Sequence, residues 1–258
     1  MQYVVFICPP VHHTYDHLVH RWLYEEVGIL HRDLSPNNIM YRRVKGKIYG
    51  VLMDFDLSSW KTDLAGDYTK TSQQRTGTPP YMAYGLLDGS EPLHMYRHDV
   101  ESLFYIMLIL ATHYTIEAPR GRRKGGVRMR GELWELPYRG WFKQPSYDDL
   151  SGIKWDFLSR MPSMHISPSF EDFRNWLEDI RLSFNRGVYS LMGHRLESKG
   201  QGTPPFDNET LGGHINYSAL INPARGLKGK LEGLIIRYEP DSSVPHGTGF
   251  TNANQTHP

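Results

Sequence analysis

Apolar side chains recur at helical spacing near the start of the chain. In HTYDHLVHRWLYEEVG, residues 13–28, Leu18, Trp22, Leu23 and Val27 follow this spacing, with steps of four positions on either side of the adjacent pair Trp22–Leu23. Gly28 comes directly after the last of them, and glycine is the residue most often found just past the end of a helix. The pattern therefore predicts a helix over 13–28 that stops at Gly28.

Two further helices are predicted downstream. The run LFYIMLILA, residues 103–111, indicates a helix over 99–113 that is buried on all sides. It has about half of the roughly 20 residues that a membrane span requires, so we expect a core helix. The stretch SFEDFRNWLEDIRLSF, residues 169–184, predicts an amphipathic helix that begins with a Ser169–Asp172 capping box. Its apolar face comprises Phe170, Phe173, Trp176, Leu177, Ile180 and Phe184.

One β-hairpin is predicted between the first two helices. IMYRRVKGKIYGVLMDF, residues 39–55, has two runs of strand-forming residues around Lys45-Gly46-Lys47. Residues 57–80 and the Gly-rich stretch 119–131 are predicted as loops. These elements predict a mainly α (α+β) fold with a short hairpin and no larger sheet.

The composition changes toward the end of the chain. From about Gly193 it is rich in Gly, Pro, Asn, Ser and Thr. One apolar piece, residues 227–236, is expected to dock on the folded part, and residues 245–258 are expected to be disordered. We therefore predict a helical domain over 1–195 and a partly disordered extension over 196–258.

Composition and charge exclude several classes of protein. The 258 residues include 29 basic and 28 acidic side chains, which argues against a nucleic-acid or membrane field over the whole chain. The single cysteine, Cys8, excludes an internal disulfide framework and favours a reducing compartment. The start, MQYVVFICPP, lacks the basic segment of a secretory signal. We expect an intracellular protein, cytoplasmic or nuclear.

Two polar stretches carry the candidate chemistry. HRDLSPNN, residues 31–38, fits the pattern HRD-x-x-x-x-N, and LMDFDLS places Asp54 directly after the hairpin. The first pattern is that of the catalytic loop of protein kinases. HRDLSPNNIM, RTGTPPYMA and YRHDVESLFYIMLIL, in this order, resemble the fungal-type protein kinase family in particular. The resemblance covers residues 18–115 well and residues 132–185 loosely.

The resemblance implies the C-terminal lobe of a protein-kinase-like fold. It also implies a Ser/Thr kinase that transfers the γ-phosphate of ATP to a hydroxyl of a protein substrate. Asp33 would accept the proton of that hydroxyl, and Ser35 would offer a hydroxyl, without charge, to the phosphates. Asn38 and Asp54 would bind ATP through Mg²⁺, because amide and carboxylate oxygens are the ligands that this ion prefers.

The resemblance assigns supporting roles to other residues. Thr78 would hydrogen-bond Asp33, and Asp99 would hold the backbone of the loop or, alternatively, cap the 99–113 helix. Structural or regulatory roles fall to His31, Arg32 and Phe55.

Three positions depart from the common kinase pattern. Asp56 stands where DFG has glycine, and we expect it to stiffen that turn. Ser35 stands where many kinases have lysine, in agreement with the fungal-type wording. Gly85 replaces the acid of Ala-Pro-Glu, which normally forms a buried ion pair. Losing one partner of such a pair can cost about 3–5 kcal/mol unless the other partner is also gone.

The motifs of an upper kinase lobe do not precede His31. No glycine occurs before Gly28 and no lysine before Lys45, so we find neither a Gly-rich loop nor a strand lysine there. We expect that the chain lacks this lobe, as a fragment, a truncated gene model or a shortened protein. We also expect the chain alone to bind Mg²⁺–ATP weakly or not at all and to transfer no measurable phosphate.

Alternatives remain for the function and for two weaker signals. The chain is alternatively a catalytically silent interaction module or a small-molecule phosphotransferase; RTGTPPYMA favours a protein substrate over a small molecule. Basic residues within 120–130 form either a solvated insert or a site for an acidic partner. They are Arg120, Arg122, Arg123, Lys124, Arg128 and Arg130. We interpret His13, His17 and His20 as surface or core side chains rather than as a metal site.

Overall fold

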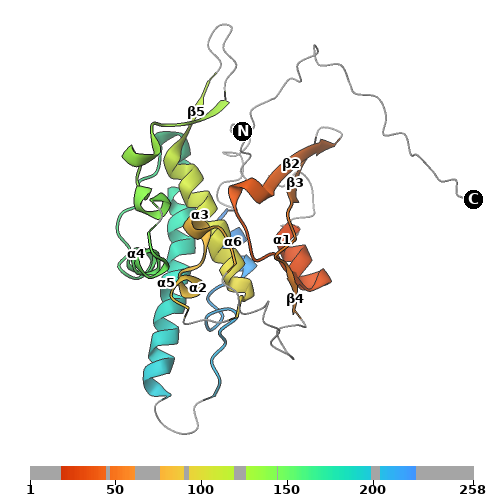
Figure 1. Ribbon diagram of the computed structural model, residues 1–258, viewed down its shortest axis with the longest axis vertical. Helices are drawn as coiled ribbons and strands as arrows, with labels where there is room; N and C mark the ends of the chain where they lie inside the picture. Colours follow the sequence, from red (N-terminus) through yellow and green to blue (C-terminus); the bar gives the residue numbers. More distant parts are fainter. Residues whose placement is uncertain are drawn as a thin grey trace, which may run out of the picture.

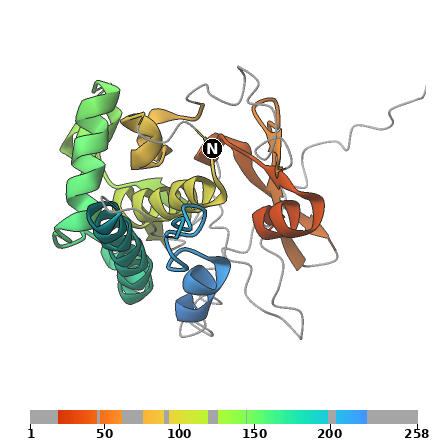
Figure 2. The same cartoon turned by 90° about the horizontal axis from the view of Figure 1, so that it is seen from below.

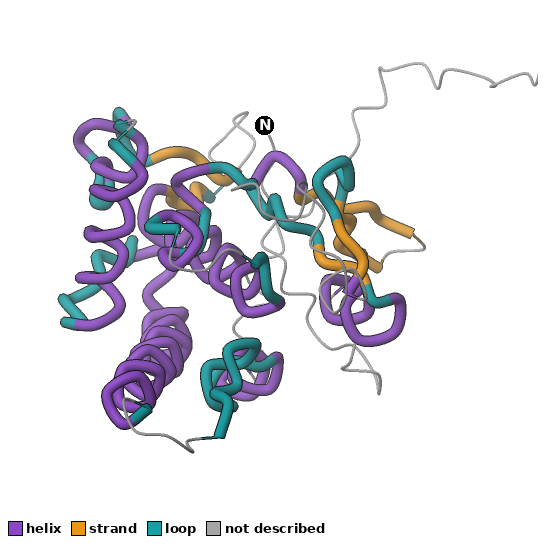
Figure 3. The backbone as a smooth tube through the Cα atoms, turned by 60° about the horizontal axis from the view of Figure 1, so that its bottom comes forward, coloured by secondary structure: helices purple, strands orange, loops and turns teal. Residues whose placement is uncertain are grey.

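A computed structural model describes residues 19–44, 47–61, 76–89, 93–118, 126–143, 145–198 and 204–224. Within these ranges the chain is mostly helical, and its strands form three small sheets (Figure 3). The α-helices are α1 Val19–Trp22, α2 Tyr84–Leu87, α3 Tyr96–His113, α4 Tyr147–Ser159, α5 Arg174–Glu197 and α6 Tyr217–Ala224. A π-helical turn, η1 Leu23–Val27, continues α1. Short 3₁₀ turns are η2 Pro36–Asn38, η4 Pro79–Tyr81, η5 Leu133–Glu135, η6 Arg139–Phe142 and η7 Pro168–Phe173.

Each sheet consists of two antiparallel strands. The strands are β1 Ile29–Leu30, β2 Ile39–Val44, β3 Lys47–Leu52, β4 Ser59–Trp60, β5 Tyr114–Glu117 and β6 Gly126–Met129. The β2–β3 pair, with Ile39 opposite Leu52 and Val44 opposite Lys47, confirms the predicted hairpin. The pairs β1–β4 and β5–β6 were not predicted. Strands of two to four residues are too short to show the alternation on which strand prediction depends.

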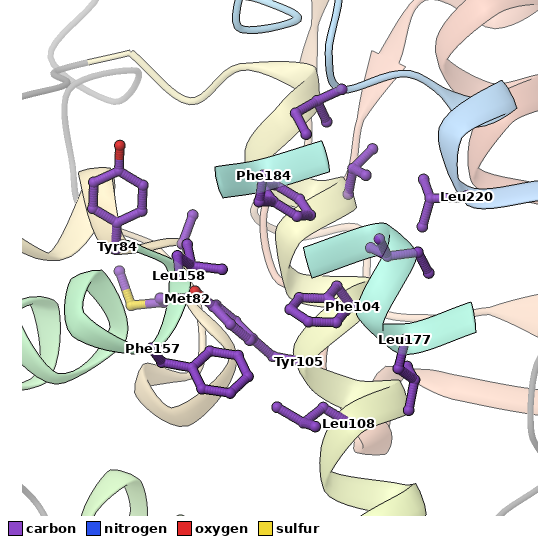
Figure 4. Close-up of a cluster of buried hydrophobic side chains, with 14 of the residues drawn as sticks. Met82, Tyr84, Phe104, Tyr105, Leu108, Phe157, Leu158, Leu177, Phe184 and Leu220 are labelled. Carbon is purple, nitrogen blue, oxygen red and sulfur yellow. The ribbon is translucent and has the colours of Figure 1, made fainter. Parts of the chain in front are cut away.

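Helix α3 lies in the middle of the molecule. The helices α4 and α5 flank one side of it, and the segment from α1 to β4 flanks the other (Figures 1 and 2). All side chains of α3 except Leu103 and Met107 are buried, as expected for a core helix. Figure 4 shows how residues of α3, α4, α5 and α6 meet in one apolar cluster. Among them are Phe104, Leu108, Leu158, Leu177, Phe184 and Leu220.

Several predicted boundaries and faces differ from the structure. Helix α3 begins at Tyr96 with Met95 as its N-cap, so the prediction of Asp99 as the cap is wrong. In the first helix Tyr24 is buried and Trp22 is 46 % exposed, because the π-helical turn rotates the apolar face. The predicted stop at Gly28 is confirmed by its left-handed φ of 80°. Residues 13–18 of that helix lie outside the described residues.

The amphipathic helix has the predicted face but not the predicted start. All six apolar residues of that face are buried. The Ser169–Asp172 capping box does not form, because the Ser169 hydroxyl accepts the Ile116 N–H at 3.1 Å and bonds Thr115 Oγ1 at 2.8 Å. A turn of 3₁₀ helix fills this region, and α5 continues from Arg174 through Glu197.

The described part of the C-terminal segment, residues 204–224, packs on α5. The Trp176 indole N–H donates to the Leu220 carbonyl at 2.7 Å, which ties α5 to α6. Gly187 lets Leu211 approach so closely that a Cβ at 187 would lie 2.7 Å from the Leu211 Cβ. The predicted docking piece 227–236 and the predicted disordered end 245–258 lie outside the described residues.

A search of the described ranges gives two negative results. None of the helices there combines the length and apolarity needed to cross a membrane. Those ranges also contain no group of three or more His, Cys, Asp or Glu side chains placed to hold a metal ion.

Substitution of alanine for Gly187 should destabilise the protein, although alanine is the better helix former. The gain in helix propensity is about 0.5–1 kcal/mol, but overpacking against Leu211 typically costs about 1–3 kcal/mol. Gly193 in the same helix is the matched control, because its Cβ would meet nothing within 4 Å. Urea unfolding should show a lower free energy of unfolding for Gly187→Ala and an unchanged or higher one for Gly193→Ala. Equal stabilisation of both variants would contradict the close packing.

Candidate functional site

The loop 31–38 and the end of the hairpin are anchored on α3 by a small apolar cluster. Leu34, directly after Asp33, and Leu52, two residues before Asp54, are both buried. They pack against Ile106 and Leu110 of α3, apart from the main core. Burying a leucine side chain contributes about 1.5–3 kcal/mol. The cluster therefore fixes both candidate acids to the same helix.

Asp99 of α3 holds the backbone of the loop. Its carboxylate accepts the His31 N–H at 2.9 Å and the Arg32 N–H at 3.1 Å. The same carboxylate accepts from His20 Nε2 at 2.9 Å and from His94 Nε2 at 2.8 Å. With four partners, the fully buried side chain meets the requirement that a buried charge be hydrogen-bonded.

These partners also set the ionisation of Asp99. Burial alone would raise the pKa of the carboxyl, but His94 and His20 lower this pKa well below its ordinary value of 3.8. The stability that follows from this shift is present above pH 3.8 and is lost as the pH falls through the lower folded-state pKa. At neutral pH, Asp99 is therefore a charged acceptor for the loop.

A second layer joins Asp99 to the C-terminal helix. The Tyr217 hydroxyl of α6 lies 2.6 Å from His20 Nδ1, so His20 bridges Tyr217 and Asp99. The Tyr217 ring also packs edge-on against Tyr96 of α3, with the centroids 5.0 Å apart. Sequence reasoning assigned no role to Tyr217, and it interpreted His20 only as a surface or core histidine.

The Asp33 carboxylate is oriented from two sides. Thr78 Oγ1 donates to Asp33 Oδ1 at 2.9 Å, the contact expected from the resemblance. Asn38 Nδ2 donates to the Asp33 carbonyl at 2.9 Å and contacts Asp33 Oδ2 at 3.3 Å. The amide nitrogen of Asn38 is thus directed at Asp33, which leaves the amide oxygen as the atom with lone pairs for a ligand.

Gly77 allows Thr78 to reach Asp33. Its φ of 127° is in the region that side chains rarely adopt, and a Cβ there would lie 2.8 Å from Met82 Cγ. The same Cβ would lie 3.5 Å from the carbonyl oxygen of Arg32. The glycine in TGTPP is therefore required by its torsion and by the nearby Met82 side chain, in the turn that brings Thr78 to Asp33.

Asp54 is held between two residues that contact the loop. The Met53 N–H donates to the Asn38 carbonyl at 2.9 Å, and His31 Nε2 donates to the Met53 carbonyl at 2.9 Å. On the other side of Asp54, the rings of Phe55 and His31 are 4.9 Å apart. Asp54 itself is exposed, and no hydrogen bond to its carboxylate is found within the described part of the chain.

The backbone strain of this turn falls on Asp54 and not on the residue that departs from the kinase pattern. Asp54 has a φ of 61°, whereas Asp56 is not among the residues with positive φ. An aspartate tolerates this left-handed conformation better than most residues. Asp56 therefore adopts no left-handed torsion, and the expected stiffening of the turn stays a prediction.

Two predicted residues of the loop are buried in the structure. Ser35 is 2 % exposed, and its carbonyl accepts the Asn38 N–H at 3.1 Å. Arg32 is 5 % exposed with a φ of 70°. Burial lowers the pKa of its guanidinium, and the charge of Asp99 opposes this effect. Both side chains are therefore part of the buried base of the loop.

The basic stretch 119–131 is only partly a loop. Its end forms strand β6, and there Arg128 forms an ion pair with Glu117 of β5 at 2.8 Å. Arg130 Nη1 donates to the Thr112 carbonyl at 3.1 Å. The other basic residues of the predicted cluster, within 120–124, lie outside the described residues.

The donor set around the loop fits Mg²⁺. Asn38 offers an amide oxygen and Asp54 an exposed carboxylate, and hard oxygen ligands of this kind are the ones Mg²⁺ takes together with phosphates. Asp33 adds a carboxylate whose orientation is fixed by Thr78 and Asn38. An anchored base beside two oxygen ligands is an arrangement that can align a hydroxyl with a metal-bound phosphate.

Sequence comparison supports this interpretation for part of the chain. Residues 18–111 match the sequence model of the fungal protein kinase family. The serine/threonine-protein kinase CHK1 of Saccharomyces cerevisiae is 34 % identical over 94 residues, which are 36 % of this chain and 17 % of that protein. The serine/threonine-protein kinase csk1 of Schizosaccharomyces pombe is 35 % identical over 85 residues, 33 % of this chain and 26 % of that protein.

The matched segment coincides with the anchored part of the site. It contains the loop 31–38, Asp54, Thr78 and Asp99. The chain spans only 17 % and 26 % of the lengths of these two relatives. Residues 18–111 are thus similar in sequence to fungal protein kinases.

Proposed function

We propose that the chain carries the part of a phosphoryl-transfer site that the C-terminal lobe of a fungal-type Ser/Thr protein kinase contributes. The reaction is transfer of the γ-phosphate of ATP to a protein hydroxyl. The observation that carries the proposal is the Thr78–Asp33–Asn38 constellation, in which Thr78 Oγ1 at 2.9 Å and Asn38 Nδ2 at 3.3 Å contact the two oxygens of one carboxylate. The relation of residues 18–111 to fungal kinases supports it.

In this proposal the residues of the site divide the work. Asp33 positions the acceptor hydroxyl and takes its proton, because its carboxylate is the one that the loop and Thr78 orient. Asn38 and Asp54 hold Mg²⁺ and through it ATP. When bound, Mg²⁺ neutralises charge on the phosphates. Asp99, His31, Arg32 and Phe55 keep these groups in place, and Ser35, although its side chain is buried here, offers its hydroxyl to the phosphates.

The partners follow from the same proposal. A protein substrate would approach the segment 78–84, which joins Asp33 to the main core. The basic stretch 120–130 is proposed as a contact for an acidic partner, although Arg128 and Arg130 already have partners within the fold. We place the reaction inside the cell, in the cytoplasm or nucleus, where ATP is available.

Removal of the Asp54 carboxylate should weaken binding of Mg²⁺–ATP. Titration of Mg²⁺–ATP, followed by amide NMR shifts, should perturb residues 33–38 and 53–55 in the wild-type chain. Asp54→Asn should raise the apparent dissociation constant at least about tenfold, the equivalent of about 1.4 kcal/mol. Asp56→Asn is the matched control, because this exposed carboxylate lies in the same turn. Equal effects of the two variants would remove Asp54 from the metal site.

Asp33→Asn should separate transfer from binding. We expect no measurable transfer from these 258 residues alone, so the role of Asp33 is tested in a fusion that also supplies a Gly-rich loop and a strand lysine. In that fusion, Asp33→Asn should keep its Mg²⁺–ATP affinity within about threefold of wild type, and its transfer of labelled phosphate to an acceptor protein should be at background, because general-base catalysis contributes about 10²–10⁴-fold. Transfer that persists in this variant would contradict the role of Asp33. Nucleotide binding that depends on Asp54, with wild type as silent as the variant, would favour the alternative of a catalytically silent interaction module.

Tyr217→Phe should loosen the loop from a distance. The variant keeps the ring but removes the hydroxyl that contacts His20 Nδ1, and an unsatisfied buried polar group costs about 1–3 kcal/mol. Hydrogen exchange should be faster at the His31 and Arg32 amides, which Asp99 accepts. Tyr189→Phe in α5, 52 % exposed, is the control and should change neither exchange nor stability. Unchanged exchange at both amides in Tyr217→Phe would show that the bridge through His20 does not support the loop.

A further inference from the structure

Lys154 of α4 is a fully buried cation beside the segment 78–84. Its side chain is 0 % exposed. The ammonium donates to the Met82 carbonyl and, at 3.3 Å, to the Pro79 carbonyl. Lysine is rarely buried unless it is paired, because removing an ammonium from water is costly. The two carbonyls that receive it belong to the segment 78–84, which also contains the Asp33 partner Thr78.

Aromatic rings complete the surroundings of the ammonium. Lys154 Nζ lies 4.3 Å from the centroid of the Tyr105 ring in α3 and 5.1 Å from that of the Trp141 ring in η6. A cation over an aromatic face is attracted by the negative face of the ring, more strongly where water is excluded. Rings from α3 and η6 thus surround the ammonium, and the acceptors found for it among the described residues are the backbone carbonyls of Pro79 and Met82.

Glu101 of α3 holds the other end of the same segment. Its Oε1 accepts the Tyr84 N–H at 2.9 Å, at the start of α2, and the Tyr105 hydroxyl at 2.6 Å. Its Oε2 has no hydrogen-bond partner within the described residues. Ser151 Oγ of α4 donates to the Tyr84 carbonyl at 3.0 Å. Figure 4 shows Tyr105 projecting from α3 toward the side where Met82 and Tyr84 lie.

The charges of this network change near neutral pH. Burial lowers the pKa of the Lys154 ammonium to about 7, against the attraction of Glu101. Burial raises the pKa of the Glu101 carboxyl to about 7, although Tyr105, the Tyr84 N–H, Lys154 and Arg97 lower it. Each charge thus depends on the other, and Tyr105 connects them, with its ring beside Lys154 and its hydroxyl on Glu101.

We propose that Lys154 and Glu101 are positioning residues for the segment 78–84, and that they replace the buried ion pair that Gly85 cannot make. An ion pair from residue 85 would fix this segment through its own side chain. Here two neighbouring helices fix the segment through its backbone. Lys154 of α4 donates to the carbonyls of Pro79 and Met82, and Glu101 of α3 accepts the N–H of Tyr84. This inference rests on the proposed function, in which the segment receives the protein substrate.

Hydrogen exchange of the full chain tests the inference. Lys154→Met keeps the length of the side chain and removes the donors, so amides of residues 81–88 should exchange at least about tenfold faster than in wild type, relative to the amides of α5. Lys154→Gln, which restores a neutral donor, should recover part of this protection. Exchange that rises evenly over α5 and residues 81–88 would overturn the inference.

A structural control and a second pair of variants separate positioning from packing. Leu158→Ala removes a fully buried side chain of the same helix and should lower the unfolding midpoint without a selective change at 81–88. Glu101→Leu should speed exchange at 84–88, whereas Glu101→Gln, which keeps an acceptor for Tyr84, should stay within about threefold of wild type. These variants decide the question if Lys154→Met does not fold, and equal exchange in both would overturn the inference. The exchange experiments contain no nucleotide, so they can fail or succeed independently of the Mg²⁺–ATP titration that tests the proposed function.

Discussion

The buried carboxylate of Asp99 is the interaction on which the arrangement of the site depends. It accepts backbone N–H groups of the loop and binds two histidines, one from α1 and one from the approach to α3. Without this carboxylate, the backbone N–H groups of His31 and Arg32 would have no acceptor on α3. Because Arg32 is in a left-handed conformation, the loop needs such an external partner to stay in place.

Helix α3 carries this carboxylate and two other supports on two faces. Successive helical residues are rotated by about 100°, so Asp99 and Ile106, seven positions apart, lie on one face, whereas Glu101 lies on the opposite side, about 200° from Asp99. Asp99 meets the loop, Glu101 meets the start of α2, and Ile106 packs on Leu34 and Leu52. A helix buried on all sides can serve three segments at once, which explains why nearly all its side chains are buried.

The departures from the kinase pattern have different consequences. Asp56 adopts no strained torsion, and the left-handed residue of the turn is Asp54, whose side chain remains exposed. Gly85 removes an acid, but the segment around it is held by Lys154 and Glu101 through its backbone. An altered motif residue therefore does not by itself show that the motif has lost its structure, because neighbouring helices can supply the missing contacts.

The sequence alone determined the parts of this protein that depend on local pattern. The hairpin at 39–55, the buried α3, the apolar face of α5 and the stop at Gly28 follow from periodicity and from the conformational freedom of glycine. The spacing of Asp33, Asn38 and Asp54 was sufficient to predict a candidate site, and Asn38 and Thr78 do contact Asp33.

Tertiary structure alone decided the contacts between distant segments. Tyr217 hydrogen-bonds His20, 197 residues away in the sequence, and Lys154 hydrogen-bonds Met82, 72 residues away. Ser169 bonds the Ile116 N–H of β5 instead of capping its own helix. No local pattern encodes such pairs, because they form only when packing brings buried polar groups together and each must find a partner.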